Sequence, residues 1–385
     1  MGDNWFLSRK LTVQRKIILL LIPHLGGGGA EHVMALLARG LSQEKYEVHL
    51  GLVQQAGVAG DALPPWVTIH PLGAVRARAG ALPLLRLVWR LRPSVVVSCG
   101  MEISFLALLL RPFFPPKTCV IVRQNATVSS ALAFADVPRS TRLLYRLLYR
   151  RSDRVICQSR AMAGDLAQVA GIGDEQIAVL PNPVDLEGIR AAWSAPSVRS
   201  GAGPHLLAVG RLSWEKGFDL LLRAFAVVRE HHPDADLIIA GSGREEGSLV
   251  LLCRSLGLET AVCFAGQVDR PYAFFPGATL FVFSSRYEGM PNALLEAAAA
   301  GLPLVATPAS GGVVDLLRDR PGAWLAPEIS AEALATTILS ALDAIRPGER
   351  FCHPFFPSSL QMAQPVAGDC ESQVPGRQAS ASAQR

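Results

Sequence analysis

The sequence predicts an α/β fold with two doubly wound, Rossmann-like domains. Short apolar segments rich in Val, Ile and Leu alternate with helix-like segments through most of the 385 residues. Most of these apolar segments lack a polar–apolar alternation, which is typical of parallel strands that are buried on both faces. The series of strands and helices runs through the chain twice, and each series predicts one parallel sheet covered by helices.

The first series predicts an N-terminal domain over residues 1–190. Its strands are expected at residues 16–22, 46–53, 67–70, 94–98, 118–123, 154–157 and 176–180. Helical patterns lie between them, at about residues 30–41, 82–91, 103–111, 139–152 and 160–170. Ligands of doubly wound sheets bind beyond the carboxyl ends of the strands, so the loops that follow strands are the candidate sites.

The second series predicts a C-terminal domain over residues 205–346. Residues 191–204, which are small, polar and rich in Gly, Pro and Ser, predict the linker before it. Its strands are expected at residues 205–209, 236–240, 262–265, 279–283 and 304–307. Its helices are expected at about residues 217–231, 244–256, 291–300, 311–318 and 330–345. Residues 347–385, rich in Pro, Ser, Gln and Ala, are expected to form a disordered tail.

The composition excludes a wholly disordered chain, because 50% of the residues are hydrophobic and 18% are charged. The net charge of +5 is too small to indicate nucleic-acid binding, so no nucleic-acid partner is expected. Residues 1–200 carry 23 basic and 13 acidic side chains, whereas residues 201–385 carry 14 basic and 19 acidic ones. This asymmetry indicates two domains that meet different partners.

The seven cysteines include no C-x-x-C pair, which argues against a disulfide framework or a zinc site. Cys99, Cys119 and Cys157 are expected to be buried thiols, in or beside apolar strands. The apolar run at residues 17–22 ends at Pro23 and is too short for a signal peptide. There is no run of about 18–20 apolar residues, so no transmembrane helix is expected. The scattered cysteines fit a reducing cytosol, so we expect a cytoplasmic protein.

A glycine loop (residues 26–31) follows the first predicted strand and opens a helix. Its four glycines let the backbone approach a ligand closely, and the helix start favours an anion. The alternative is a tight turn for helix–strand packing. A dinucleotide-binding dehydrogenase is disfavoured, because the second strand ends in Gln54 and Gln55 where an acidic residue is needed.

Arg211 and Lys216 lie between another strand and the helix that follows it. A planar guanidinium and a compact ammonium both suit phosphate oxygens. The alternative for this pair is two solvated loop charges.

Residues 287–296 carry two carboxylates around a predicted helix start. Pro291 suits the first helical position, so Glu288 falls in the preceding loop and Glu296 on the second turn. Backbone N–H groups left free at the helix start could hold a diphosphate, namely those of Met290, Asn292, Ala293 and Leu294. Carboxylates beside a phosphate site are expected to bind hydroxyls of a sugar or ribose. The alternative is a capping Glu288 and a surface Glu296.

Two arginine clusters lie in the N-terminal half. The first repeats every four residues beside Leu and Tyr, at Arg142, Arg146, Arg150 and Arg154; the second comprises Arg76, Arg78, Arg86, Arg90 and Arg92. A basic face with apolar neighbours predicts docking on an anionic membrane surface, and the alternative is an ordinary solvated face.

Together these segments resemble the retaining glycosyltransferases of family 4, which have the GT-B fold of two Rossmann-like domains facing across a cleft. The resemblance covers about residues 16–345. It is carried by Gly210-Arg211-Leu212 with Lys216-Gly217, by the E-x7-E pair of Glu288 and Glu296, by residues 180–185 and by the glycine loop. The glycine loop is most similar to that of members acting in polysaccharide and lipopolysaccharide biosynthesis at the cell envelope.

The resemblance implies a role for each residue of the site. Arg211 and Lys216 would neutralise the diphosphate of the donor, Glu288 would hold donor-sugar hydroxyls, and Glu296 would hold the ribose. Glu288, Arg211 and Lys216 are thus the expected catalytic residues. Main-chain donors to the nucleotide sugar would come from Gly289, Met290, Asn292, Ala293 and Leu294. The acceptor would dock near Gly27 and Gly28.

The resemblance also implies the partners. A nucleotide sugar, with UDP as the first candidate nucleotide, would act as co-substrate without a bound metal or other cofactor. The acceptor would be a glycan or a lipid-linked saccharide, met at the inner face of the cytoplasmic membrane. A nucleotide-sugar 2-epimerase of the same fold and a non-catalytic nucleotide-sugar-binding subunit are the alternatives.

The sequence departs from the family at two places. Many members carry a His after a middle strand of the first domain, where this chain has Arg123-Gln124-Asn125, and no general base can be named. Members usually end in a helix that crosses back to the first domain, whereas residues 347–385 carry no such amphipathic pattern.

Overall fold

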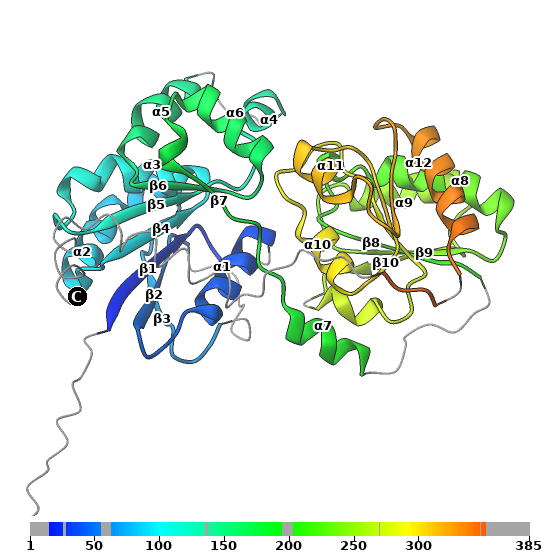
Figure 1. The fold of residues 1–385 in the computed structure, drawn as a ribbon, viewed down its shortest axis with the longest axis horizontal. Helices are drawn as coiled ribbons and strands as arrows, with labels where there is room; N and C mark the ends of the chain where they lie inside the picture. Colours follow the sequence, from blue (N-terminus) through cyan, green and yellow to red (C-terminus); the bar gives the residue numbers. More distant parts are fainter. Residues whose placement is uncertain are drawn as a thin grey trace, which may run out of the picture.

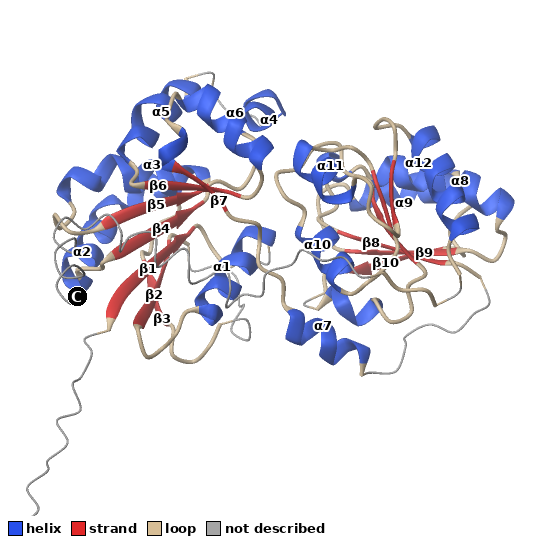
Figure 2. Cartoon of the chain, viewed as in Figure 1, coloured by secondary structure: helices blue, strands red, loops and turns tan. Residues whose placement is uncertain are grey.

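The computed structural model describes residues 15–25, 28–54, 63–134, 138, 140–194, 203–268, 270–346 and 348–351. The chain forms two α/β domains that lie side by side (Figure 1). Each domain contains one parallel sheet, of seven strands in the first and six in the second, with helices on both faces (Figure 2). The predicted fold class is confirmed.

The sheet of the first domain has the order β3-β2-β1-β4-β5-β6-β7. Its strands are β1 (Lys16–Ile22), β2 (Tyr46–Leu52), β3 (Thr68–Pro71), β4 (Val95–Cys99), β5 (Cys119–Arg123), β6 (Arg154–Cys157) and β7 (Ile177–Val179). One face packs on α1 (Gly29–Gly40). The other packs on a layer that includes α2 (Ala81–Leu91), α3 (Met101–Leu110), α4 (Val128–Phe134), α5 (Thr141–Leu148) and α6 (Arg160–Ala170).

The sheet of the second domain has the order β10-β9-β8-β11-β12-β13. Its strands are β8 (His205–Val209), β9 (Asp236–Ala240), β10 (Val262–Gly266), β11 (Leu280–Phe283), β12 (Leu304–Ala306) and β13 (Ala323–Leu325). One face is covered by α8 (Phe218–His231), α9 (Glu246–Ser255) and α12 (Ala331–Ala344). The other is covered by α7 (Leu186–Trp193), α10 (Asn292–Ala299) and α11 (Gly311–Leu317).

Strand β1 illustrates why the apolar segments form central parallel strands. Successive strand residues point to opposite faces, and residues 18–22 are all at most 1% exposed. Leu19 and Leu21 belong to the core under α2 and α3, whereas Ile18 and Leu20 belong to the core under α1. A strand that fills two cores must be apolar at every position, so it shows no alternation.

The crossover between the domains differs from the predicted linker. Ala191–Trp193 were assigned to the linker, but they form the last residues of α7. The helix begins at Leu186 because the Asp185 side chain caps it, accepting a hydrogen bond from Gly188 N at 3.0 Å. Val184 and Ile189 pack in the core of the second domain. The chain therefore enters that domain before residue 191; residues 195–202 lie outside the described part.

Two residues of the predicted disordered tail pack against the second domain. Arg350 places its guanidinium 5.0 Å from the centre of the Trp193 ring and donates to Ala278 O at 3.2 Å. Phe351 donates from its backbone N to Gly301 O at 2.9 Å. The prediction of disorder is wrong for these residues, and residues 347 and 352–385 lie outside the described part.

The cysteines follow the prediction with one exception. Cys99 and Cys157 are buried free thiols. The prediction of a free thiol at Cys119 is wrong, because Cys119 is disulfide-bonded. Its partner lies outside the described residues. No helix in the described part of the chain is long and apolar enough to cross a membrane.

Candidate active site

The candidate residues gather at the points where the strand order of each sheet reverses. These points lie between β1 and β4 in the first sheet and between β8 and β11 in the second. The glycine loop follows β1, and two further loops follow β8 (residues 210–217) and β11 (residues 284–291). Doubly wound sheets bind their ligands beyond the carboxyl ends of the strands at such reversals.

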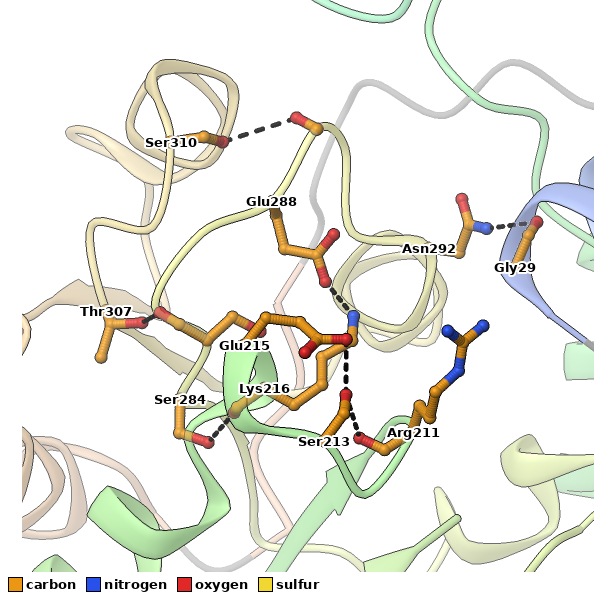
Figure 3. Close-up of polar contacts among 12 residues, drawn as sticks. Gly29, Arg211, Ser213, Glu215, Lys216, Ser284, Glu288, Asn292, Thr307 and Ser310 are labelled. Carbon is orange, nitrogen blue, oxygen red and sulfur yellow. Dashed lines mark hydrogen bonds and ion pairs between the residues drawn. The ribbon is translucent and has the colours of Figure 1, made fainter. Parts of the chain in front are cut away.

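The β8–α8 loop is held in place by Gly217. This residue caps α8 with φ +63°, a conformation that favours glycine, and a Cβ on it would lie 2.1 Å from Ser284 O. The Ser284 hydroxyl donates to Lys216 O at 2.9 Å (Figure 3). The backbone beside Lys216 is thereby fixed against the β11–α10 loop.

Lys216 and Glu288 come together, and Arg211 lies on the same loop as Lys216. The Lys216 ammonium forms an ion pair with the Glu288 carboxylate. Arg211 and Lys216 extend from one loop toward Glu288 and Asn292 (Figure 3). Burial lowers the pKa of Lys216 to about 8; the Glu215 carboxylate opposes that shift and Arg211 adds to it. Lys216 is therefore not a solvated loop charge.

Arg211 keeps its guanidinium available beside the glycine loop of the first domain. The residue is exposed, and the guanidinium forms no hydrogen bond with any residue that the structure describes. A Cβ on Gly28 would lie 3.5 Å from its Nη2 atom. Arg211 of the second domain therefore lies beside the glycine loop of the first, and Gly27 falls outside the described residues.

Glu215 is a residue of this loop that the sequence analysis missed. Its Oε1 accepts a hydrogen bond from the Ser213 hydroxyl at 2.5 Å. Burial alone would raise the pKa of Glu215, but this hydrogen bond and the charges of Lys216 and Arg211 lower it overall. The carboxylate balances part of the positive charge of the loop.

Helix α10 begins at Asn292, one residue later than predicted, and Pro291 is its N-cap. Within the described part of the chain no acceptor is found for the backbone N–H groups of Met290, Asn292, Ala293 and Leu294. Such free groups at a helix start favour an anion. A Cβ on Gly289 would lie 2.6 Å from Asn125 O of the first domain, so the loop before α10 packs tightly across the domain boundary.

Glu296 lies on the second turn of α10 and is buried, so the alternative of a surface carboxylate is wrong. Burial raises its pKa to about 8, and the Asp185 carboxylate adds to the shift. His32 Nε2 lies 3.5 Å from Glu296 Oε1, although it belongs to α1 of the first domain. Burial also lowers the pKa of His32; Asp185 opposes that shift and Arg39 adds to it.

Asn182 and Arg123 are buried residues at the domain boundary, which the sequence analysis noted only as parts of longer segments. Asn182 Nδ2 donates to Asn292 Oδ1 at 2.6 Å, and Arg123 Nη2 donates to Asn182 Oδ1 at 2.5 Å. Asn292 Nδ2 in turn donates to Gly29 O at 2.8 Å (Figure 3). The Pro residues at 181 and 183, which keep Asn182 out of regular structure, were the available signal.

The described residues contain no group of three or more His, Cys, Asp or Glu that could hold a metal ion. A reaction without a bound metal stays a prediction.

Two family models match the chain. The model described as "Glycosyltransferase Family 4" matches residues 27–188, and the model described as "Glycosyl transferases group 1" matches residues 190–347. Together they span both domains.

One similar curated protein comes from Campylobacter jejuni and is named N-acetylgalactosamine-N,N'-diacetylbacillosaminyl-diphospho-undecaprenol 4-alpha-N-acetylgalactosaminyltransferase. It is 29% identical over 316 residues, which cover 78% of this chain and 83% of that protein.

Solved structures share the two-domain fold. Sucrose-phosphate synthase from Thermosynechococcus elongatus superimposes with a TM-score of 0.73 at 19% identity, covering 93% of this chain and 94% of the other. Anabaena HepE in complex with UDP and glucose superimposes with a TM-score of 0.69 at 18% identity, covering 92% and 95%.

Proposed function

Because this chain belongs to the GT-B glycosyltransferases of the group 1 and family 4 type, we propose that it moves a sugar from a nucleoside diphosphate sugar to a lipid-linked or cell-envelope glycan, with retention of the anomeric configuration. The observation that carries the proposal is the convergence of Arg211, Lys216 and Glu288 beside the free N–H groups at the start of α10. Two cations and a helix start suit a diphosphate, whose charge grows as the sugar departs.

Each residue of the site binds a different part of the donor. Lys216 and Arg211 hold the diphosphate, and the backbone N–H groups of Met290, Asn292, Ala293 and Leu294 add neutral donors. When the diphosphate takes over Lys216, the Glu288 carboxylate loses its ion-pair partner and accepts hydrogen bonds from sugar hydroxyls. Glu296 accepts hydrogen bonds from the ribose. These hydroxyls favour the ionised carboxylate and lower its pKa from about 8 when the donor binds.

The choice of partners rests on the relatives. The Campylobacter jejuni protein is named for transfer to a saccharide on undecaprenol diphosphate, which supports a lipid-linked acceptor here. The HepE structure contains UDP, which supports a UDP-sugar donor. The acceptor approaches along the glycine loop, where Gly28 lies close to Arg211. The nucleotide sugar is a co-substrate, and no metal is required.

A peripheral membrane surface is the second part of the proposal. The layer of α2, α3, α5 and the short turn after α3 (Arg111–Phe113) carries large apolar side chains that are more than half exposed: Leu82, Trp89, Leu109, Phe113, Leu143 and Leu147. Exposed arginines lie among them at Arg86, Arg90, Arg142, Arg146 and Arg150, whereas Arg154 belongs to strand β6. A mixed basic and apolar face suits anionic lipid headgroups. The lipid-linked acceptor would reach the cleft from that surface.

A transfer assay tests the enzymatic part. The purified chain is incubated with a panel of nucleotide sugars and an undecaprenyl-diphosphate-linked saccharide; mass spectrometry detects the product and NMR gives its anomeric configuration. We expect one donor to be used, with about a 100-fold to 1,000-fold loss in Lys216→Ala. Arg254→Ala is the matched control, since Arg254 is 67% exposed on α9.

Three outcomes would count against the proposal. Unchanged transfer by both Lys216→Ala and Glu288→Ala would remove the proposed site. If NMR shows that the donor is converted in the absence of any acceptor, the chain is a 2-epimerase. Nucleotide-induced thermal stabilisation without turnover of any acceptor would identify a binding subunit.

A further inference from the structure

A chain of side-chain hydrogen bonds crosses the domain boundary beneath the candidate site. It consists of Arg123, Asn182, Asn292 and the backbone carbonyl of Gly29, and is called the amide relay below. Arg123 is the last residue of β5, Asn182 lies in the crossover, and Asn292 and Gly29 are the first residues of α10 and α1. The first two side chains are 5% and 4% exposed.

The direction of the amide relay is fixed from both ends. A guanidinium can only donate, so Asn182 must turn its oxygen to Arg123 and its amide nitrogen to Asn292. A backbone carbonyl can only accept, so Asn292 must turn its nitrogen to Gly29. Both requirements give the same orientation for the two amides, with each link between 2.5 and 2.8 Å.

Arg123 is held firmly enough to orient the others. Its Nη1 atom donates to Asn125 Oδ1 at 2.7 Å, and Cys99 Sγ lies 3.4 Å from the same atom. None of the described Asp or Glu carboxylates forms an ion pair with Arg123. A buried cation without a carboxylate depends on its neutral oxygen acceptors, so the Asn182 and Asn125 oxygens are strongly bound to it.

The amide relay ends at two helix starts, and in the proposed function each of them faces a different substrate. Asn292 opens α10, whose free N–H groups face the donor side. Gly29 opens α1 at the glycine loop on the acceptor side. Near Arg123 the first domain also approaches the β11–α10 loop, since a Cβ on Gly289 would lie 2.6 Å from Asn125 O. Displacement of Asn182 would therefore loosen both sides of the cleft at once.

We propose that Arg123 is a positioning residue that acts through Asn182 and Asn292, aligning the donor-side helix start with the glycine loop for transfer. This inference rests on the proposed function. Arg123 touches neither substrate in this arrangement. The diphosphate contacts of Arg211 and Lys216 lie within the second domain and do not pass through the amide relay. Loss of the amide relay therefore lowers kcat and leaves KM for the donor nearly unchanged.

Isosteric variants test the amide relay. In Asn182→Asp the side chain still accepts from Arg123 but no longer donates to Asn292, and Asn292→Asp loses the link to Gly29. We expect kcat to fall about tenfold or more in each. KM for the donor should stay within about twofold in Asn182→Asp, whereas it should rise in Asn292→Asp, because the new carboxylate lies at the helix start that holds the diphosphate. The double variant should lose no more than the worse single variant, because one broken link interrupts the whole amide relay.

The control is Gln176→Glu, which removes a partly buried amide donor just before strand β7, at the amino ends of the strands of the first sheet. Gln176 Nε2 contacts Ser152 and Tyr149, before strand β6. We expect this variant to lose thermal stability and keep kcat. Equal kcat losses in the control and in Asn182→Asp would show that general destabilisation causes the loss of kcat. Unchanged kcat, additive losses in the double variant, or a raised KM for the donor with normal kcat would overturn the proposal.

Hydrogen exchange separates failure of the amide relay from failure of the proposed function. In Asn182→Asp we expect faster exchange at the starts of both α1 and α10, and no change there in Gln176→Glu. If the wild-type chain transfers no sugar but this paired change occurs, the proposed function fails and the structural link stands. Faster exchange at only one helix start, or at neither, would overturn the amide relay itself.

Discussion

His32 of α1 lies 3.5 Å from Glu296 of α10, so a pair of titratable side chains joins the two domains. The His32 Nε2 atom is buried and has no hydrogen-bond partner in the described structure. The pKa of Glu296 is raised to about 8 and that of His32 is lowered, both chiefly by burial. Near neutral pH burial therefore favours the uncharged forms of both groups.

Replacing Glu296 with Gln should change the pH dependence of stability. A raised carboxyl pKa means that the contribution of Glu296 to the free energy of unfolding is fully present below its ordinary value and is lost as the pH rises through about 8. Wild type should therefore lose stability relative to Glu296→Gln between about pH 5 and pH 8. Urea denaturation of both proteins across this range measures the difference. Glu259→Gln, at a side chain 52% exposed, is the control; a constant difference for Glu296→Gln would contradict the prediction.

The activity of the wild type should fall above about pH 8. The pKa of Lys216 is lowered to about 8, so its ammonium loses its proton and no longer neutralises the diphosphate. The pH profile of kcat/KM for the donor reports this group in the free enzyme. In Lys216→Arg the alkaline limb should disappear, since a guanidinium stays charged, although the maximal rate falls because the geometry changes. An alkaline limb that persists in Lys216→Arg would assign it to another group.

Gly217→Ala should destabilise the second domain and impair the site together. The left-handed backbone costs a non-glycine residue about 1–2 kcal/mol, and the added Cβ would also lie 2.1 Å from Ser284 O. Gly257→Ala is the matched control, with φ +68° and no heavy atom within 4 Å of the added Cβ. Urea denaturation should give only the backbone cost for Gly257→Ala and a larger loss for Gly217→Ala. Equal losses in the two variants would show that the contact with Ser284 O is easily relieved.

Binding to anionic liposomes should depend on the exposed leucines of α5. The double variant Leu143→Ser and Leu147→Ser removes two side chains that are each 57% exposed beside Arg142 and Arg146. Flotation with vesicles containing phosphatidylglycerol should show weaker binding, and salt should reduce binding of the wild type. Leu251→Ser is the control, since Leu251 is 63% exposed on α9 of the second domain. Salt-insensitive binding, or none, would leave this face an ordinary solvated surface.

The sequence predicts elements whose signal is local. Strand β1 was predicted with correct ends because residues on both of its faces are buried. Strand β13 was missed because its apolar segment is short, lacks β-branched residues and is only partly buried. Helix α7 was missed because its last residues, Ala191–Trp193, merge with small residues that resemble a linker.

The residues of the site also fall into two groups, those that the sequence predicts and those that it does not. Arg211, Lys216 and Glu288 could be predicted because each follows a recognisable strand. The contact between Asn292 and Gly29 could not, since 263 positions separate the two residues and only the packing of two whole domains brings them together. The raised pKa of Glu296 likewise depends on burial and on the charge of the distant Asp185 carboxylate, and His32 of the first domain lies 3.5 Å from Glu296.

The contact of Arg350 with Trp193 limits how far the chain can be truncated from its C-terminal side without disturbing the second domain. Trp193 ends the crossover helix, and Arg350 covers its ring while bonding to Ala278 O. Phe351 adds a backbone bond to Gly301 and an edge-on contact with Trp324 at 6.4 Å. A chain shortened at the last helical residue would lose these contacts and expose more of Trp193 and Trp324, which favours aggregation. The shortest stable form for expression and crystallisation therefore ends beyond Phe351.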